Sequence, residues 1–263
     1  MNLLFNSYNN QLCLLMRVKT LMPQKIKIHV RDANMPKTVY TNRYKTVNGE
    51  FSFLIRLPIT PKVLAISVYN QKNGNMPEGK DKTFSLVEKR YIPLITKVRL
   101  FDFKNPLIRS FVQFALEFSQ AASYISAGQS VYVSDDGKFR IDYADVIKDS
   151  KGGVLRTPAR ISQDTGRIEI SKQRFNEFTV PMRFITLLHE FSHYYINKDM
   201  SREDQADFNA LLIYLGLGFP RIEAIQAFTE IFVKSPHMVN AERWLKIKKF
   251  ITEFEDVELQ ILN

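Results

Sequence analysis

The pentapeptide His189-Glu190-Phe191-Ser192-His193 constrains this chain more than any other stretch. It lies in an apolar run with helical periodicity, and a helix returns to the same face after about four residues, so both imidazoles are expected to point the same way. Two imidazoles with a carboxylate beside them can hold zinc, while the glutamate acts as general base. The spacing therefore predicts a helix over residues 181–197 that supplies two ligands of a metal site.

A third ligand is expected from the acidic segment that begins eight residues after His193. Ser201 followed by Asp204 fits a capping-box-like start of a second helix, which places Glu203 and Asp207 on one face. Catalytic zinc commonly takes two histidines and a carboxylate, and Glu203 is best placed to complete that set. Asp207, one turn later, is placed to accept a hydrogen bond from the outer nitrogen of a ligand histidine.

These residues carry a resemblance to a known family. The motif at residues 189–193, followed by Glu203-x-x-Ala206-Asp207, resembles that of the gluzincin zinc metallopeptidases. It is most similar to the prenyl-protease and HtpX-like branch and to the soluble minigluzincins. The resemblance covers residues 105–255, and it implies zinc-dependent hydrolysis of peptide bonds with Glu190 as general base.

The same branch has a histidine followed six residues later by an arginine, a pattern that appears here as His237 and Arg243. The resemblance points to His237 as the catalytic donor to the developing oxyanion, ahead of Tyr194 and Tyr195, and to Arg243 as a residue near the substrate. The pattern departs from the family at the next position. Met238 stands where a proline usually follows the histidine.

A small sheet is expected just before the motif helix. Two hairpin-like spacings occur around the turns at 135–137 and 163–166. In the families that this chain resembles, one edge strand of such a sheet holds the peptide substrate as an added strand. Residues 158–162 are the candidate for that strand, and an ordinary internal hairpin is the alternative. Asn105 and Pro106 predict the start of a long apolar helix before the sheet.

The charge distribution suggests two domains. Residues 1–104 hold 18 Lys and Arg against 6 Asp and Glu, whereas residues 105–263 hold 19 against 21. Period-two apolar patterns from residue 25 to about 99, split by turn residues, predict short strands of a β-sandwich-like module. We therefore expect an α+β protein, with a basic β-rich module for binding or attachment over 1–104 and a gluzincin-like zinc peptidase domain over 105–263.

The basic module suggests an anionic partner, either nucleic acid or an acidic protein, and a solvated basic face kept for solubility is the alternative. Cys13 is the only cysteine, which favours a reducing compartment. The N-terminus lacks the pattern of a signal peptide, and no apolar run approaches the roughly 20 residues that span a bilayer. We expect a soluble cytoplasmic protein, or a virion-associated one if a phage encodes it.

Other functions are compatible with the same sequence features. The chain can be a structural, assembly or partner-binding protein, for example of a phage or mobile element, that retains a metallopeptidase fold. The basic module can instead face DNA and bring a peptidase to a repressor, although no helix-turn-helix or zinc-finger pattern accompanies it. The histidines and carboxylates of the motif region can also form a structural polar cluster without metal.

Overall fold

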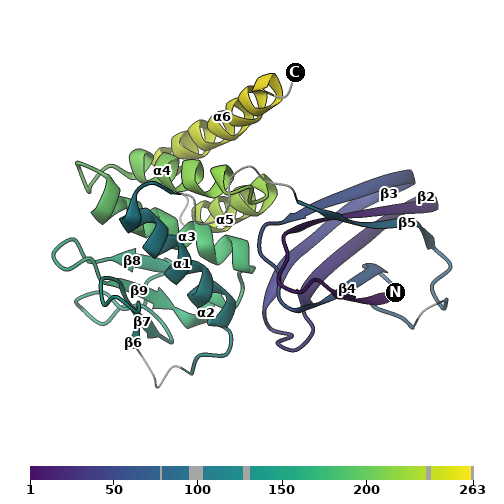
Figure 1. The fold of residues 1–263 in the computed structure, drawn as a ribbon, viewed down its shortest axis with the longest axis horizontal. Coiled ribbons are helices and arrows are strands. Elements are labelled where there is room, and N and C mark those ends of the chain that lie inside the picture. The colour runs from purple at the N-terminus through teal and green to yellow at the C-terminus, as the bar shows by residue number, and fades with distance from the viewer. Residues whose placement is uncertain (78, 95–102, 127–130, 235–237, 262–263) are drawn as a thin grey trace. The chain divides into compact units, whose positions relative to one another are not determined.

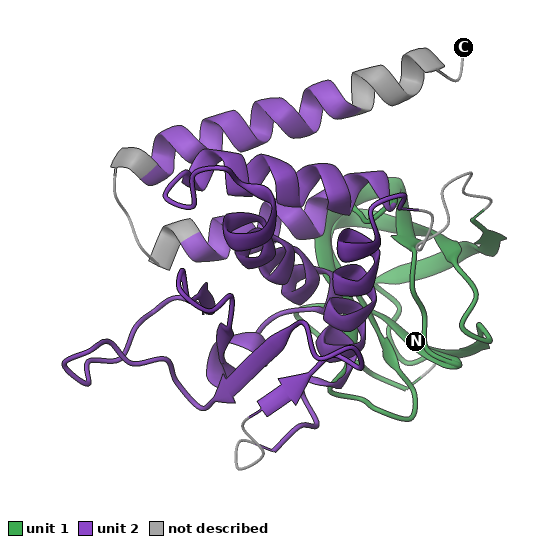
Figure 2. Ribbon diagram, turned by 60° about the vertical axis from the view of Figure 1, so that its left-hand side comes forward, with its two compact units in different colours: residues 1–99, 218–220 green, residues 100–217, 221–263 purple. Residues whose placement is uncertain are grey.

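The computed structural model describes residues 1–77, 79–94, 103–126, 131–234 and 238–261. The chain divides into two compact units, residues 1–99 with 218–220 and residues 100–217 with 221–263 (Figure 2). The first unit is built from an antiparallel sheet, and the second combines helices with a small sheet (Figure 1). The protein is therefore of the α+β class.

The first unit is a five-stranded antiparallel sheet. Its strands are β1 (Asn2–Asn6), β2 (Leu12–Asp32), β3 (Val39–Leu57), β4 (Val63–Asn70) and β5 (Phe84–Pro93). They follow the order β1-β4-β2-β3, and β5 also pairs with β2. The expected short strands over 26–30 and 51–55 are parts of the much longer β2 and β3. Alternate residues of β2 are buried, as a sheet with one covered face requires.

The two longest strands bend, and the bend folds this sheet over on itself. The first part of β2 pairs with β5 and the last part with β4, with a register shift between Thr20 and Gln24. Arg43 donates a hydrogen bond of 3.3 Å to the carbonyl of Leu54, eleven residues further along the same strand. The single sheet therefore forms two layers, between which the apolar face of β2 is buried.

The second unit begins with α1 (Pro106–Ala121), and Asn105 caps it by accepting hydrogen bonds from the amides of Leu107 and Ile108. A four-stranded sheet follows, formed by β6 (Val131–Val133), β7 (Arg140–Ala144), β8 (Ala159–Ile161) and β9 (Ile168–Ser171). Both expected hairpins are present, β6 with β7 and β8 with β9. A parallel pairing of β7 with β9 joins them, so β8 lies at an edge of the sheet.

The remaining elements are helical. They are α2 (Lys172–Phe175), α3 (Val180–Phe191), the π-helical turn η1 (Ser192–Ile196), α4 (Glu203–Gly216), α5 (Arg221–Lys234) and α6 (Met238–Ile261). Helix α3 contacts α1, α4, α5 and β8, and almost all of its residues are buried. A helix that is apolar on nearly every side belongs in a protein interior. The motif helix is therefore the centre of this unit.

Two side chains of α3 fix the position of this helix. Phe191, one of the two variable positions of the motif, stacks on Phe111 of α1 with ring centroids 4.0 Å apart. Arg183 is fully buried and donates hydrogen bonds to the carbonyls of Phe175 and Ser119 and to the hydroxyl of Ser123. Burial lowers the pKa of Arg183 to about 10, and the acceptors around it compensate its charge.

In the described part of the chain, no helix has both the length and the apolar character that crossing a membrane requires.

Candidate metal centre

His189 and His193 point their Nε2 atoms toward the same point. His189 lies in the last turn of α3 and His193 in η1, where the backbone widens to a π-helical turn. The two Nε2 atoms are 3.1 Å apart, and the imidazole planes are inclined by 86°. Single π-helical turns inside helices are frequent at functional sites. The four-residue spacing thus brings two ring nitrogens together, as the sequence predicts.

The other ring nitrogen of each histidine faces a hydrogen-bond acceptor. Nδ1 of His189 is buried and lies 3.0 Å from Oδ1 of Asp207, an ion-pair distance at which the angles of a hydrogen bond are not met. Nδ1 of His193 lies 2.8 Å from the carbonyl oxygen of Met200 and is in hydrogen-bond geometry with it. An acceptor at Nδ1 places the proton of a neutral imidazole there and leaves the lone pair on Nε2. Both lone pairs are then directed at the same point.

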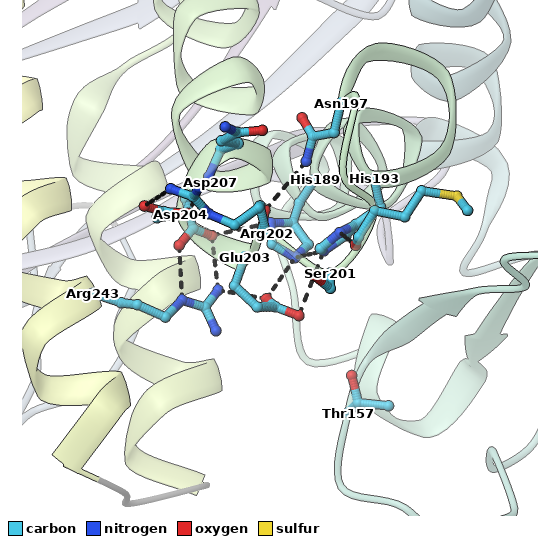
Figure 3. Close-up of polar contacts among 12 residues, drawn as sticks. Thr157, His189, His193, Asn197, Ser201, Arg202, Glu203, Asp204, Asp207 and Arg243 are labelled. Carbon is cyan, nitrogen blue, oxygen red and sulfur yellow. Dashed lines mark hydrogen bonds and ion pairs between the residues drawn. The ribbon is translucent and has the colours of Figure 1, made fainter.

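Glu203 brings a carboxylate to this point from the first turn of α4. Its two oxygens lie 3.5 Å from Nε2 of His189 and 3.6 Å from Nε2 of His193 (Figure 3). One donor atom from each of these residues falls within 4.8 Å of the other two. The three residues can therefore hold a metal ion together, and among the described residues they form the one such group of three or more.

The start of α4 differs from the sequence expectation. Arg202 occupies the N-cap position without a side-chain cap, and the hydroxyl of Ser201 donates to Asp199 at 2.6 Å. The predicted capping box between Ser201 and Asp204 is therefore wrong, because the serine hydroxyl is hydrogen-bonded to the carboxylate of Asp199 instead. Glu203 and Asp207 still share a helix face, since that depends only on their four-residue spacing.

A buried ion pair between Asp207 and Arg243 contacts two of the three ligand candidates. Asp207 is 1% exposed and accepts two hydrogen bonds of 2.9 Å from the guanidinium of Arg243 on α6. The same guanidinium reaches Glu203 at 2.9 Å, as Figure 3 shows. Arg243 therefore ties α6 to both carboxylates, and Asp207 in turn orients His189. The structure thus places Asp207 where the sequence predicts it, behind the histidine pair.

The local charges favour a cation at this point. Burial opposes charge on His189, but its contacts with Asp207 and Glu203 outweigh burial and raise the pKa of the imidazole to about 10. Burial also opposes charge on Glu203, yet the two histidines and Arg243 hold the pKa of this carboxyl well below its usual range. Without a metal, a proton on His189 supplies the positive charge that this arrangement favours.

Glu190 lies beside the ligands and is not one of them. It is 8% exposed, and burial raises the pKa of its carboxyl. The backbone amide of Ile161 in β8 lies near it and acts in the opposite direction, favouring the charged form. A buried carboxyl with a raised pKa holds a proton more readily than an exposed one.

The site opens into a cleft of about 520 Å³. One wall is the segment from Thr157 to Ile161, which contains the edge strand β8. An apolar part of the lining comes from Ile185 of α3 and from Ala227, Phe228 and Ile231 of α5. The three ligand candidates and Glu190 also line this cleft.

Other predicted site residues lie elsewhere. Tyr194 does not line the cleft, and its ring packs against Tyr195 and Gly166. Tyr195 directs its hydroxyl toward the carbonyl of Lys138 at 3.4 Å. Neither tyrosine is thus positioned as an oxyanion donor. His237 lies outside the described residues.

The structure also changes the interpretation of Arg243 and adds a group that the sequence did not suggest. Arg243 lines the cleft, but its guanidinium is engaged by Glu203 and Asp207, so its contacts are those of a positioning residue. The carbonyl of Met200 orients His193. A backbone acceptor has no signature in the residue type, so only the loop conformation could have shown it.

Comparisons with protein-family models, with curated proteins and with solved structures found no match to this chain.

Proposed function

We propose that this protein is a zinc-dependent endopeptidase of the gluzincin type. The observation that carries the proposal is the convergence of His189, His193 and Glu203 on one point, with both Nδ1 atoms facing acceptors. The motif supplies the expected general base, Glu190, beside that point. A zincin-like arrangement of the second unit is part of the same proposal.

The residues present fit a zinc ion. Two imidazole nitrogens and one carboxylate form a ligand set that catalytic zinc sites use, and this set leaves a position for water. Orientation of the histidines by Asp207 and a backbone carbonyl is the support that ligand histidines normally have. When bound, zinc supplies Lewis acidity and lowers the pKa of water to about 7.

Glu190 would move the protons in this reaction. Its carboxylate would accept a proton from the attacking water and deliver it to the leaving amine of the peptide. The raised pKa suits both steps, because a carboxyl poised nearer neutrality can hold the proton between them. Glu190 lies near the amide of Ile161, in the strand along which we place the substrate.

The substrate would bind as an added strand along β8. This strand lies at an edge of its sheet and lines the cleft. Unpaired backbone groups at a sheet edge can hydrogen-bond an extended peptide whatever its sequence. Side-chain selection would then come from the apolar wall formed by α3 and α5.

The alternative is an assembly or partner-binding protein that retains the fold. The buried cluster around Asp207 and Arg243 fits this alternative also, because its charges are paired without metal. The two proposals differ in what zinc does. A peptidase needs the ion for turnover, whereas an assembly protein needs only its partner.

The test combines metal content with cleavage. We expect the purified protein to carry one zinc ion per chain and to cleave an unfolded, fluorescently labelled protein. 1,10-Phenanthroline should abolish cleavage, and added zinc should restore it. Stoichiometric zinc without cleavage of any unfolded protein, together with co-purification of a large partner, would favour the assembly protein.

A further inference from the structure

One half of the folded sheet in the first unit carries cations almost without carboxylates. This half consists of β1, β4, residues 25–32 of β2 and residues 39–47 of β3. It contains Lys25, Lys27, Arg31, Arg43 and Lys45, and its single acidic residue is Asp32. Asp32 is buried and accepts hydrogen bonds from the amides of two residues in the following turn. This half therefore has basic residues with hardly any acidic residue to offset them.

Three of these cations form a column with His29 along the outer face of β2. Ile26, Ile28 and Val30 are fully buried on the inner face, so the alternating Lys25, Lys27, His29 and Arg31 project outward. Strand geometry spaces them at regular intervals along the middle of this half-sheet. We call these four residues the basic column.

Tyrosines flank the basic column on both sides. Lys27 is directly paired with Tyr44 of β3 and with Tyr69 of β4, so the three residues form one row across the sheet. Tyr44 is 61% exposed, and the ammonium of Lys25 lies 4.0 Å from its ring centroid. The next row places Asn42 and Ser67 beside His29. The face therefore combines cations, aromatic rings and neutral hydrogen-bonding groups.

The other half of the same strand is different. Arg17 and Lys19 of β2 pair with Glu88 and Glu50 at 2.9 and 3.0 Å. In the described structure no carboxylate makes an ion pair with the basic column, and Nε of Arg31 is buried without a hydrogen-bond partner. Burial and the nearby charges of Arg31 and Lys27 lower the pKa of His29. The face is thus a region of uncompensated positive potential.

We propose that the basic column and its flanking tyrosines bind single-stranded nucleic acid. Lysine and arginine neutralise backbone phosphates without regard to sequence. Exposed aromatic rings on a sheet provide surfaces on which unpaired bases stack, and every base has such a face. The exposed amide of Asn42 can hydrogen-bond base edges or sugars. An acidic protein would use the same cations but would gain much less from the tyrosines.

This binding is independent of the metal site. It uses only residues of the first unit, whereas the proposed peptidase uses only residues of the second. Loss of one activity therefore says nothing about the other.

The test measures binding of fluorescent oligothymidylate and oligouridylate to the full chain by anisotropy over a range of salt concentrations. Both are expected to bind, with log K falling linearly with log salt. The double variant Lys25→Gln, Lys27→Gln should reduce the slope by about 1.4, since each phosphate contact to a single strand contributes about 0.7. Arg31→Gln should reduce it by about 0.7. Tyr44→Ala should weaken binding about tenfold by removing a stacking surface.

The matched control removes two exposed lysines from the second unit, Lys148→Gln with Lys151→Gln, and should leave binding unchanged. Unchanged melting temperatures would show that the variants are folded. Absence of salt-dependent binding, or an equal loss in the control, would overturn the proposal. A polyglutamate peptide that binds as tightly as the oligonucleotides, with no effect of Tyr44→Ala, would also overturn it and indicate an acidic protein partner.

Discussion

Nε2 of His189 and Nε2 of His193 lie 3.1 Å apart, while the Nδ1 atoms of the same rings face acceptors on two other segments. Two nitrogen lone pairs brought this close repel each other unless a cation or a proton lies between them. Asp207 and the carbonyl of Met200 nevertheless hold the rings in this orientation. The protein therefore maintains an arrangement that a metal ion would stabilise.

Removing one ligand should remove the metal. His193→Ala eliminates one of three proposed donors, and we expect its zinc content after dialysis to fall close to zero. His29→Ala removes a histidine from the sheet of the first unit and should leave one zinc ion per chain. Atomic emission analysis of both variants measures this directly. Undiminished zinc in His193→Ala would contradict the ligand assignment.

Asp207 should tune the affinity for zinc. Asp207→Asn keeps the shape of the side chain but weakens the contact with Nδ1 of His189, so zinc affinity should fall about 10- to 100-fold. Competition with a chromogenic chelator measures this change. Asp204→Asn is the matched control, because it removes the same charge from the same helix at a position whose carboxylate pairs with Arg202 and lies near Lys246. Equal effects of the two substitutions would contradict an orienting role.

The metal-free protein should lose stability in alkaline solution. The pKa of His189 is about 10 in the folded state, against about 6.5 in an unfolded chain. A raised pKa gives stability that is fully present below pH 6.5 and is lost as the pH rises through about 10. The melting temperature without metal should therefore fall across this interval. Zinc should abolish the decline, because ligation requires the neutral imidazole.

Asp207→Asn provides the control for this pH effect. It removes the contact that raises the pKa of His189, so the melting temperature of the metal-free variant should vary less over the same interval. A decline as steep as that of the wild type would assign the effect to other groups.

The apolar wall should select the side chain next to the scissile bond. Ile231→Ala enlarges the cleft, so the ratio of kcat/KM values should shift toward peptides with a bulkier apolar residue. The shift should be about 10- to 200-fold, as expected when methylene-sized volumes change in an apolar pocket. Ile222→Ala makes the same change at a 42% exposed position of the same helix and should leave the ratio unchanged. A shift in both variants, or in neither, would contradict this assignment.

Local signals predicted much of the second unit. Asn105 caps α1, Pro181 lies in the first turn of α3, and both hairpins form around their turn residues. Each signal acts over a few neighbouring residues, so the sequence carries it directly. The convergence of His189 and His193 follows from helical spacing in the same way.

Features that depend on distant or backbone groups were not predictable. The folding of one long sheet into two layers depends on which half of β2 pairs with β4 or with β5. The parallel pairing of β7 with β9 joins residues 27 positions apart in the chain, such as Ile141 and Ile168. At the metal site, Ser201 turned to Asp199, and the carbonyl of Met200 oriented His193. Residue types alone do not determine which distant strand or which backbone group a residue contacts.

The most direct test of the proposed function is the cleavage rate of Glu190→Gln at equal zinc occupancy. Glutamine retains the shape of the side chain but cannot carry the proton, and Glu190 is not among the three proposed ligands. We predict that the variant binds one zinc ion per chain and cleaves unfolded protein about 10²- to 10⁴-fold more slowly than the wild type. Cleavage by zinc-loaded Glu190→Gln at the wild-type rate would contradict the proposed mechanism.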